Sequence, residues 1–161
     1  MSTSTPPPAT PPSPSPTPAG KPGRRVPAGV TIERRVAWED TDASGHYHHG
    51  TVIRWVEEAE GVLQERLGID LFGRLPRVHY EVDYAARLWY GDRVEVTLTV
   101  AEVGRTSLRF TFDVHRADDV AARGALVAVH AESPTEGPTA WPDTVRKALL
   151  ESGPQRAERL T

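Results

Sequence analysis

An α+β fold is the class that the sequence predicts, and two periodicities predict it. Between residues 50 and 67, large apolar side chains recur every three or four residues, which is the spacing of one face of a helix. After residue 77, four segments alternate apolar and polar residues, which is typical of strands with one buried face. One amphipathic helix followed by several strands favours a single core in which the sheet covers the helix.

Residues 1–29 precede these elements and are expected to form a disordered, proline-rich tail. Ten of the 15 prolines lie in this segment, together with almost no large apolar residue. Such a segment buries too little surface to offset the entropy lost on ordering. The remaining residues, 30–161, are numerous enough for one compact domain.

Three elements are expected at the start of this domain. A first strand covers residues 30–37, where large apolar residues occupy even positions, and a polar loop at 38–48 follows it. The long helix then spans about residues 50–67. Gly68 fits the glycine that commonly ends a helix.

The second half of the domain is expected to be mostly sheet. The alternating segments are residues 78–84, 94–100, 108–114 and 125–131, and a short helix at 143–150 follows them. Because their connections are short, we expect an antiparallel meander. A sheet curled around the single long helix would cover its apolar face, and this arrangement is the hotdog architecture.

Charge and composition exclude several functional classes. The tail carries three basic residues and no acidic one, so 22 acidic and 16 basic residues remain in the domain. A domain this acidic is a poor partner for nucleic acid. No apolar run is long enough to span a membrane, and no signal-peptide core is visible. The absence of cysteine excludes disulfides and thiolate sites, so the cytoplasm is the expected compartment.

The polar loop before the long helix holds the residues most suited to chemistry. Asp40 and Asp42 lie there with three histidines in the span 46–49. A carboxylate near a helix N-terminus can act as general base or nucleophile, while free backbone amides can hold an oxyanion. An aspartate at this position is, however, more often a helix cap or part of a turn.

The same loop resembles the active-site segment of a known family. It reads DTDASGHYHH from Asp40 to His49 and is followed by Arg54 and Trp55. This run resembles the 4-hydroxybenzoyl-CoA thioesterase family, including its YbgC-like acyl-CoA thioesterases. The turns at residues 88–92 and 104–107 resemble the family's later turns. The resemblance covers roughly residues 30–141 and implies a hotdog fold and hydrolysis of an acyl thioester.

The resemblance also implies roles for individual residues. Asp42 matches the catalytic aspartate, and His49 matches the position at the start of the helix that is Tyr or His in the family. Asp40 matches the first acid of the loop, which we interpret as structural. Substrate-binding positions implied by the match are Gly45, His48, Gly50 and Thr51. Neither a metal nor a cofactor is implied.

The implied substrate is a thioester of coenzyme A or of an acyl-carrier protein. Asp42 could attack the carbonyl or draw a proton from water, and both routes stay open. The family places its sites between two subunits, so we expect a dimer or a tetramer. Trp89 and Tyr90 are candidates for the contact between subunits.

Three other functions compete with this interpretation. His46 and Glu60 could form the His–Glu pair of a hotdog dehydratase or hydratase. The domain could also be a non-catalytic module that binds acyl-CoA. A metal site at the histidines is disfavoured, because adjacent His48 and His49 do not easily converge on one ion.

Overall fold

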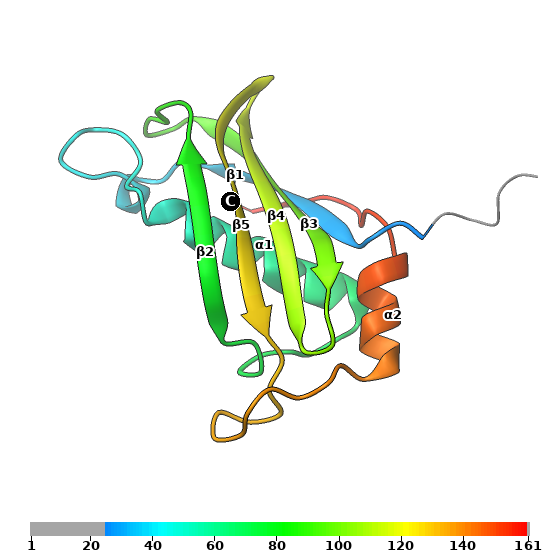
Figure 1. Ribbon diagram of the computed structural model, residues 1–161. Helices are drawn as coiled ribbons and strands as arrows, with labels where there is room; N and C mark the ends of the chain where they lie inside the picture. The colour runs from blue at the N-terminus through cyan, green and yellow to red at the C-terminus, as the bar shows by residue number, and fades with distance from the viewer. Residues whose placement is uncertain (1–24, 161) are drawn as a thin grey trace, which may run out of the picture.

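The computed structural model describes residues 25–160 and has the predicted α+β architecture (Figure 1). Both helices and three of the four alternating strands form close to their predicted positions, while the last strand, predicted at 125–131, begins already at Asp119. The elements in chain order are β1 (Gly29–Arg35), the 3-10 helix η1 (Trp38–Asp40), α1 (Thr51–Leu67), β2 (Arg77–Tyr84), β3 (Arg93–Val103), β4 (Ser107–Arg116), β5 (Asp119–Val129), α2 (Asp143–Glu151) and β6 (Glu158–Arg159).

One curled sheet contains all six strands, in the order β2-β5-β4-β3-β1-β6. The prediction of a meander is therefore right for β3, β4 and β5 and wrong for β2, which pairs with β5 at the far edge. Alternation shows which side chains face the core, but it does not identify the neighbouring strand. The parallel strand β6 was not predicted, because two residues are too short to show a pattern.

Helix α1 supplies the centre of the core. Figure 1 shows it crossing one face of the sheet, with α2 at one side. Its residues at three- and four-residue spacing, Val52, Val56, Ala59 and Leu63, are almost fully buried, and the sheet adds Phe110 and other large side chains. Each of the larger side chains, such as Leu63 or Phe110, stabilises the fold by about 1.5–3 kcal/mol relative to an exposed one. The helix ends at Gly68, which adopts the left-handed conformation with a φ of 66°.

The domain begins earlier than the sequence predicted. Residues 1–24 of the predicted tail lie outside the described residues, but residues 25–29 pack on the domain. Ala28 is fully buried, and its backbone N–H donates to the carbonyl of Leu149 at 2.9 Å. The short side chains of this segment gave no alternating pattern, so its contact with α2 could not be predicted.

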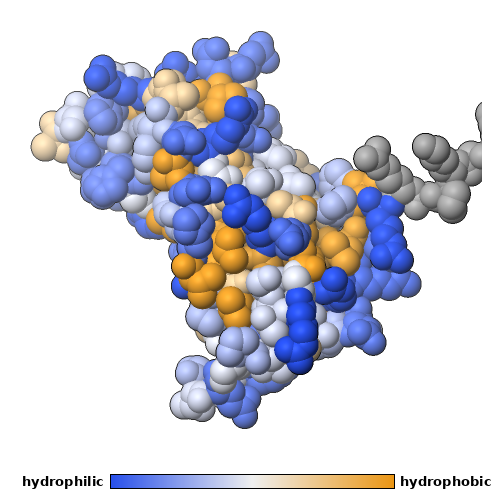
Figure 2. Space-filling model, in the orientation of Figure 1, coloured by the Kyte–Doolittle hydropathy of each residue, from blue (hydrophilic) through white to orange (hydrophobic). Residues whose placement is uncertain are grey.

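The face of the sheet turned away from α1 mixes hydrophilic and hydrophobic side chains (Figure 2). Ion pairs cross this face between strands, Arg109 with Glu81 at 3.0 Å and Arg123 with Asp113 at 2.8 Å. Between residues 25 and 160, no helix is long and apolar enough to cross a membrane.

Candidate active site

Asp40 anchors the loop that precedes α1. Its carboxylate is buried and accepts hydrogen bonds from the backbone N–H of Ala37 at 2.8 Å and from Arg54 at 3.2 Å. Its carbonyl oxygen accepts from the N–H of His48 at 2.7 Å and from the hydroxyl of Thr51 at 2.9 Å. These hydrogen bonds join Asp40 to the segment before it, to the loop and to the first turn of α1.

Asp42 lies two residues further on, in an exposed turn. Its carboxylate accepts from the backbone N–H of Ser44 at 2.8 Å, and its own N–H donates to the carbonyl of His46 at 3.1 Å. The bond from Ser44 is the largest cause that lowers the pKa of Asp42 below its ordinary value, and the nearby His46 also lowers it. Asp42 is therefore ionised at neutral pH and accessible to a reactant.

A groove of about 640 Å³ opens beside Asp42 at the start of α1. One wall comes from the loop and the other from the end of β2 and the connection to β3. The lining residues are Asp42, His46, Tyr47, His49, Tyr84, Ala85, Ala86, Arg87 and Trp89. The structure thus places both predicted catalytic residues, Asp42 and His49, in one groove.

Some of the backbone N–H groups where the loop enters α1 are already used. The N–H of His48 donates to Asp40, that of Gly50 donates to the Nδ1 atom of His48 at 2.9 Å, and that of Thr51 donates to the carbonyl of His48 at 2.9 Å. Within residues 25–160 the N–H of His49 has no hydrogen-bond partner. A free donor at a positive helix end can stabilise a developing oxyanion.

The four predicted substrate-binding positions shape the loop and do not line the groove. Thr51 is fully buried, and its hydroxyl is bonded to Asp40. Gly45 has a φ of 85°, which favours glycine, and a Cβ there would lie 3.5 Å from the ring of Trp89. The backbone N–H of Gly50 donates a hydrogen bond to the Nδ1 atom of His48.

The second wall of the groove was missed from the sequence. Tyr84 donates its hydroxyl to the carbonyl of His49, and Trp89 packs edge-on against His46 with ring centroids 5.8 Å apart. Tyr47 is buried and donates to the carbonyl of Ala86 at 3.0 Å; burial raises the pKa of its phenol to about 12. Two aromatic residues, Tyr84 and Trp89, could have indicated this wall. The predicted meander paired β2 with the wrong strand, so the contact of these residues with the loop was not predicted.

The dehydratase hypothesis required Glu60 to pair with His46, and the two residues do not pair. The buried carboxylate of Glu60 accepts from Arg77 at 3.1 and 2.6 Å and from Gln64 at 3.1 Å, and it lines a different cavity, between α1 and the segment that leads to β2. Burial raises the pKa of Glu60 despite the opposing effect of Arg77. In the part of the chain that the structure describes, no cluster of three or more His, Asp or Glu side chains could hold a metal ion.

Comparison with known proteins identifies the family. Residues 36–149, more than half of the chain, match the thioesterase-like superfamily. The chain belongs to this superfamily. The matched segment spans the loop, α1 and strands β2 to β5, and the hotdog fold and the thioesterase family predicted from the sequence are confirmed.

Individual relatives agree with this assignment. The chain is 33% identical over 102 residues to a 1,4-dihydroxy-2-naphthoyl-CoA hydrolase from Rippkaea orientalis, covering 59% of this chain and 72% of the relative. A predicted thioesterase from Bacillus stearothermophilus has a similar structure, with a TM-score of 0.69 and 27% identity over 75% of this chain and 93% of that one. The 1,4-dihydroxy-2-naphthoyl-CoA thioesterase from Synechocystis has a TM-score of 0.69 at 24% identity, covering 75% and 95% of the two chains, and supports the fold.

Proposed function

We propose that the protein hydrolyses acyl-CoA thioesters in the groove at the start of α1. The observation that carries the proposal is that one open groove is lined by Asp42, whose carboxylate is ionised, and by His49, whose backbone N–H is unpaired. A thioester needs these two elements: an anion that attacks or activates water, and a donor for the carbonyl oxygen. Membership of the thioesterase-like superfamily supports this chemistry.

In the proposed reaction the carbonyl oxygen of the thioester accepts from the N–H of His49. Asp42 then draws a proton from an attacking water or attacks the carbonyl itself to form an anhydride, which water hydrolyses. Either route breaks the carbon–sulfur bond and yields a carboxylic acid and a thiol. The side chain of His49 is available in the groove to orient the substrate or to transfer a proton.

The proposed acyl group is aromatic and hydroxylated. Tyr84 and Trp89 line the groove and offer flat apolar surface next to Asp42. The relative from Rippkaea orientalis carries a name that includes a dihydroxynaphthoyl group. Because a carrier-protein thioester presents the same bond, both carriers belong among the candidate substrates.

Release of free thiol from a panel of acyl-CoAs and acyl-carrier-protein thioesters tests this function. We expect turnover with at least one aromatic acyl-CoA, and faster turnover than with straight-chain acyl groups of similar size. Tight binding of acyl-CoA without thiol release from any compound would instead identify a non-catalytic binding module.

The active unit is proposed to be a dimer or a tetramer. Strand β2 is an edge of the sheet, and Val78 on it is 60% exposed. Unpaired edges with apolar side chains favour pairing with a second copy. Trp89, which lines the groove, and the next residue, Tyr90, are exposed and could contact a second copy. Sedimentation at micromolar concentration tests the proposal, and a fully active species of 17.7 kDa would contradict it.

The compartment proposed for this reaction is the cytoplasm. The sequence contains no cysteine, so the fold needs no oxidising environment. Fractionation of cells that express the full chain tests this, and recovery outside the cytoplasm would contradict it.

A further inference from the structure

The loop that leads into α1 contains two histidines whose rings are bonded in opposite ways. The Nδ1 atom of His46 lies 3.1 Å from the carbonyl oxygen of Tyr47, so it carries the hydrogen that this bond needs. The Nδ1 atom of His48 lies 2.9 Å from the backbone nitrogen of Gly50 and accepts its hydrogen. Both ring nitrogens of a charged histidine are donors, so protonation keeps the bond of His46 and breaks that of His48.

The ring of His48 takes the place of a helix cap. Gly50 occupies the N-cap position of α1 and has no side chain that could accept a backbone N–H. His48 instead accepts two of the N–H groups at this end, that of Gly50 on its ring and that of Thr51 on its carbonyl oxygen. A Cβ on residue 50 would lie 3.1 Å from the Nδ1 atom of His48, so glycine leaves the room that the ring occupies.

The cap encloses the peptide unit that carries the proposed oxyanion donor. Between the ring of His48 and the N–H of Gly50, the chain runs through the peptide bond that joins His48 to His49. The hydrogen bond closes this stretch into a ring of atoms, so it restricts the rotations that set the direction of the His49 N–H. The ring of His49 also packs on that of His48, with centroids 4.0 Å apart.

We propose that His48 is a positioning residue that acts only in its neutral form. Its imidazole caps α1 and fixes the peptide unit of the His49 N–H, and a proton on the ring removes the cap. The charged ring would also lie at the positive end of the helix. Histidine side chains ordinarily change charge between about pH 5 and pH 8. This inference rests on the proposed function, since it names the residue that orients the oxyanion donor of that reaction.

Other ionisable groups lie at the same end of the helix. They are Asp42, His46 and His49 in the loop, Asp40 with Arg54 at the first turn of α1, and Tyr84 and Arg87 in the opposite wall of the groove. His48→Asn leaves all of them unchanged and supplies an acceptor that does not titrate, because an asparagine side chain accepts the N–H two residues further on. The comparison with the parent protein at each pH therefore isolates the proton on His48.

The first experiment measures kcat for thiol release between pH 5.5 and pH 8. At pH 8 the parent and His48→Asn should agree within about twofold, and at pH 5.5 the parent should be about fivefold slower, as expected from the loss of a helix cap. A ratio that does not change with pH would overturn the proposal. A loss of about 100-fold in His48→Asn at every pH would show that His48 itself transfers a proton, and would overturn its positioning role.

His48→Phe removes the acceptor at every pH. It keeps a flat ring beside His49 but cannot accept the N–H of Gly50, so it should be about fivefold slower than the parent already at pH 8. A variant that is as fast as the parent at pH 8 would contradict the need for the acceptor.

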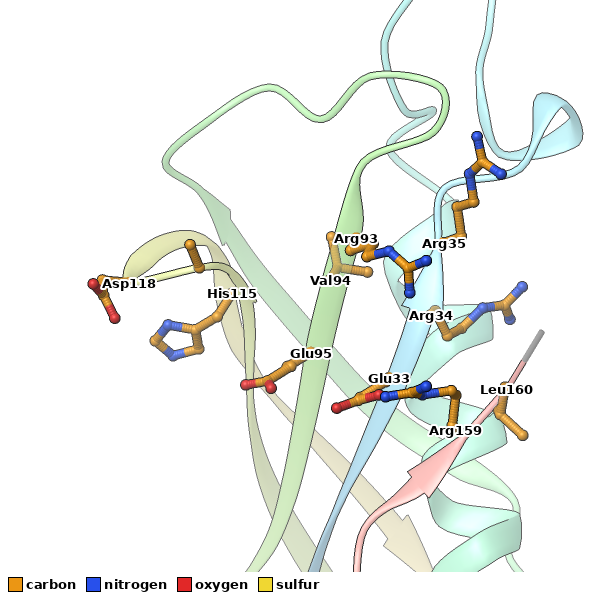
Figure 3. A pocket seen from close by; sticks show the side chains of 11 residues that line it. Glu33, Arg34, Arg35, Arg93, Val94, Glu95, His115, Asp118, Arg159 and Leu160 are labelled. Atoms are coloured by element: carbon orange, nitrogen blue, oxygen red, sulfur yellow. The ribbon is translucent and has the colours of Figure 1, made fainter.

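His115→Asn is the matched control. His115 lies on β4 and lines a separate cavity of about 700 Å³ at the end of the sheet, together with Arg93, Glu95 and Asp118 (Figure 3). This cavity shares no lining residue with the groove of Asp42. The control should have the same kcat as the parent at each pH. A change with pH as large as that in His48→Asn would show that the effect does not come from the cap.

Thermal unfolding of the full chain gives a readout that does not need hydrolysis. The Tm of the parent should match that of His48→Asn at pH 8 and lie about 2–4 °C below it at pH 5.5, because the cap is lost only when the ring is charged. Equal Tm values at both pH values would contradict the cap. If no thioester is hydrolysed, the proposed function fails, and the Tm still decides whether His48 caps α1. Hydrolysis with a constant ratio contradicts the role of His48 alone.

Discussion

Asp42 and Glu60 are two carboxylates in contrasting environments, the first in the loop before α1 and the second within the helix. Asp42 is exposed before the helix and accepts a backbone hydrogen bond, while Glu60 is buried within the helix and accepts from Arg77 and Gln64. The environment lowers the pKa of Asp42 and raises that of Glu60. An ionised carboxylate in an open groove can react, whereas a satisfied buried carboxylate serves as a structural acceptor.

Removing the charge of Asp42 should have the largest effect. We expect Asp42→Asn to lower kcat by about 100-fold or more with little change in Tm, because the shape is kept and the reacting charge is lost. The matched control is Asp40→Asn, which should mainly lower stability, by about 1–2 kcal/mol. Thiol release and thermal unfolding measure both variants. A greater catalytic loss at Asp40 than at Asp42 would reverse the two roles.

At Glu60 the hydrogen-bond acceptor should matter more than the charge. Glu60→Ala leaves the donors of Arg77 and Gln64 without their acceptor and should lower the free energy of unfolding by about 2 kcal/mol. Glu60→Gln keeps one acceptor oxygen but sets an amide NH2 against one of the two Arg77 donors, so it should cost less than Glu60→Ala without being neutral. Denaturant titration gives both values. Equal losses in the two variants would be evidence that the charge itself stabilises the helix.

The pH dependence should distinguish the same two carboxylates. The lowered pKa of Asp42 means that its contribution to stability and to kcat is present at neutral pH and is lost only as the pH falls below the usual range for aspartate. The raised pKa of Glu60 has the opposite sign, because its ionisation opposes folding at neutral pH and protonation relieves this. We expect the part of the kcat profile that depends on Asp42 to fall only below about pH 5. An acidic limb with a midpoint above pH 5 that disappears in Glu60→Gln would assign catalysis to Glu60.

Deletion of residues 1–24 should have the smallest effect. We propose that this segment is the disordered tail predicted from its composition, so its loss removes no packed apolar surface. Turnover and Tm of the shortened chain should match those of the full chain. Further deletion to residue 29 is the informative comparison, because it removes buried Ala28 and should lower Tm. A large loss from the first deletion would contradict the disordered tail.

Local patterns predicted most of the elements, because each depends on a period that is visible in the chain. The stripe from Val52 to Leu63 marked the buried face of α1, and Gly68 marked its end. The position of β2 depended instead on its pairing with β5. These two strands are neighbours in the sheet, but β3 and β4 separate them in the sequence. Long-range pairing leaves no local period, so the strand order could not be obtained in this way.

The residues of the candidate site fall into the same two groups, those found from a local pattern and those brought in by long-range pairing. Asp42 and His49 belong to one short loop and were found from its residues. Tyr84 and Trp89 reach the groove from a connection about 40 residues later, and the hydroxyl of Tyr84 meets the carbonyl of His49 only because β2 lies at the sheet edge. The part of a site that one segment contains could be predicted, and the part that tertiary structure assembles could not.

The position of β1 in the sheet has a consequence for how the chain folds. Strands β3, β4 and β5 pair with their chain neighbours, whereas Ile32 of β1 pairs with Val96 and with Glu158 of β6. Contacts between such distant residues close large loops and form slowly. We therefore expect the hairpins of β3–β5 to form early and β1 to join late. The loop of Asp42, held between β1 and α1, would then be among the last parts of the domain to become ordered during folding.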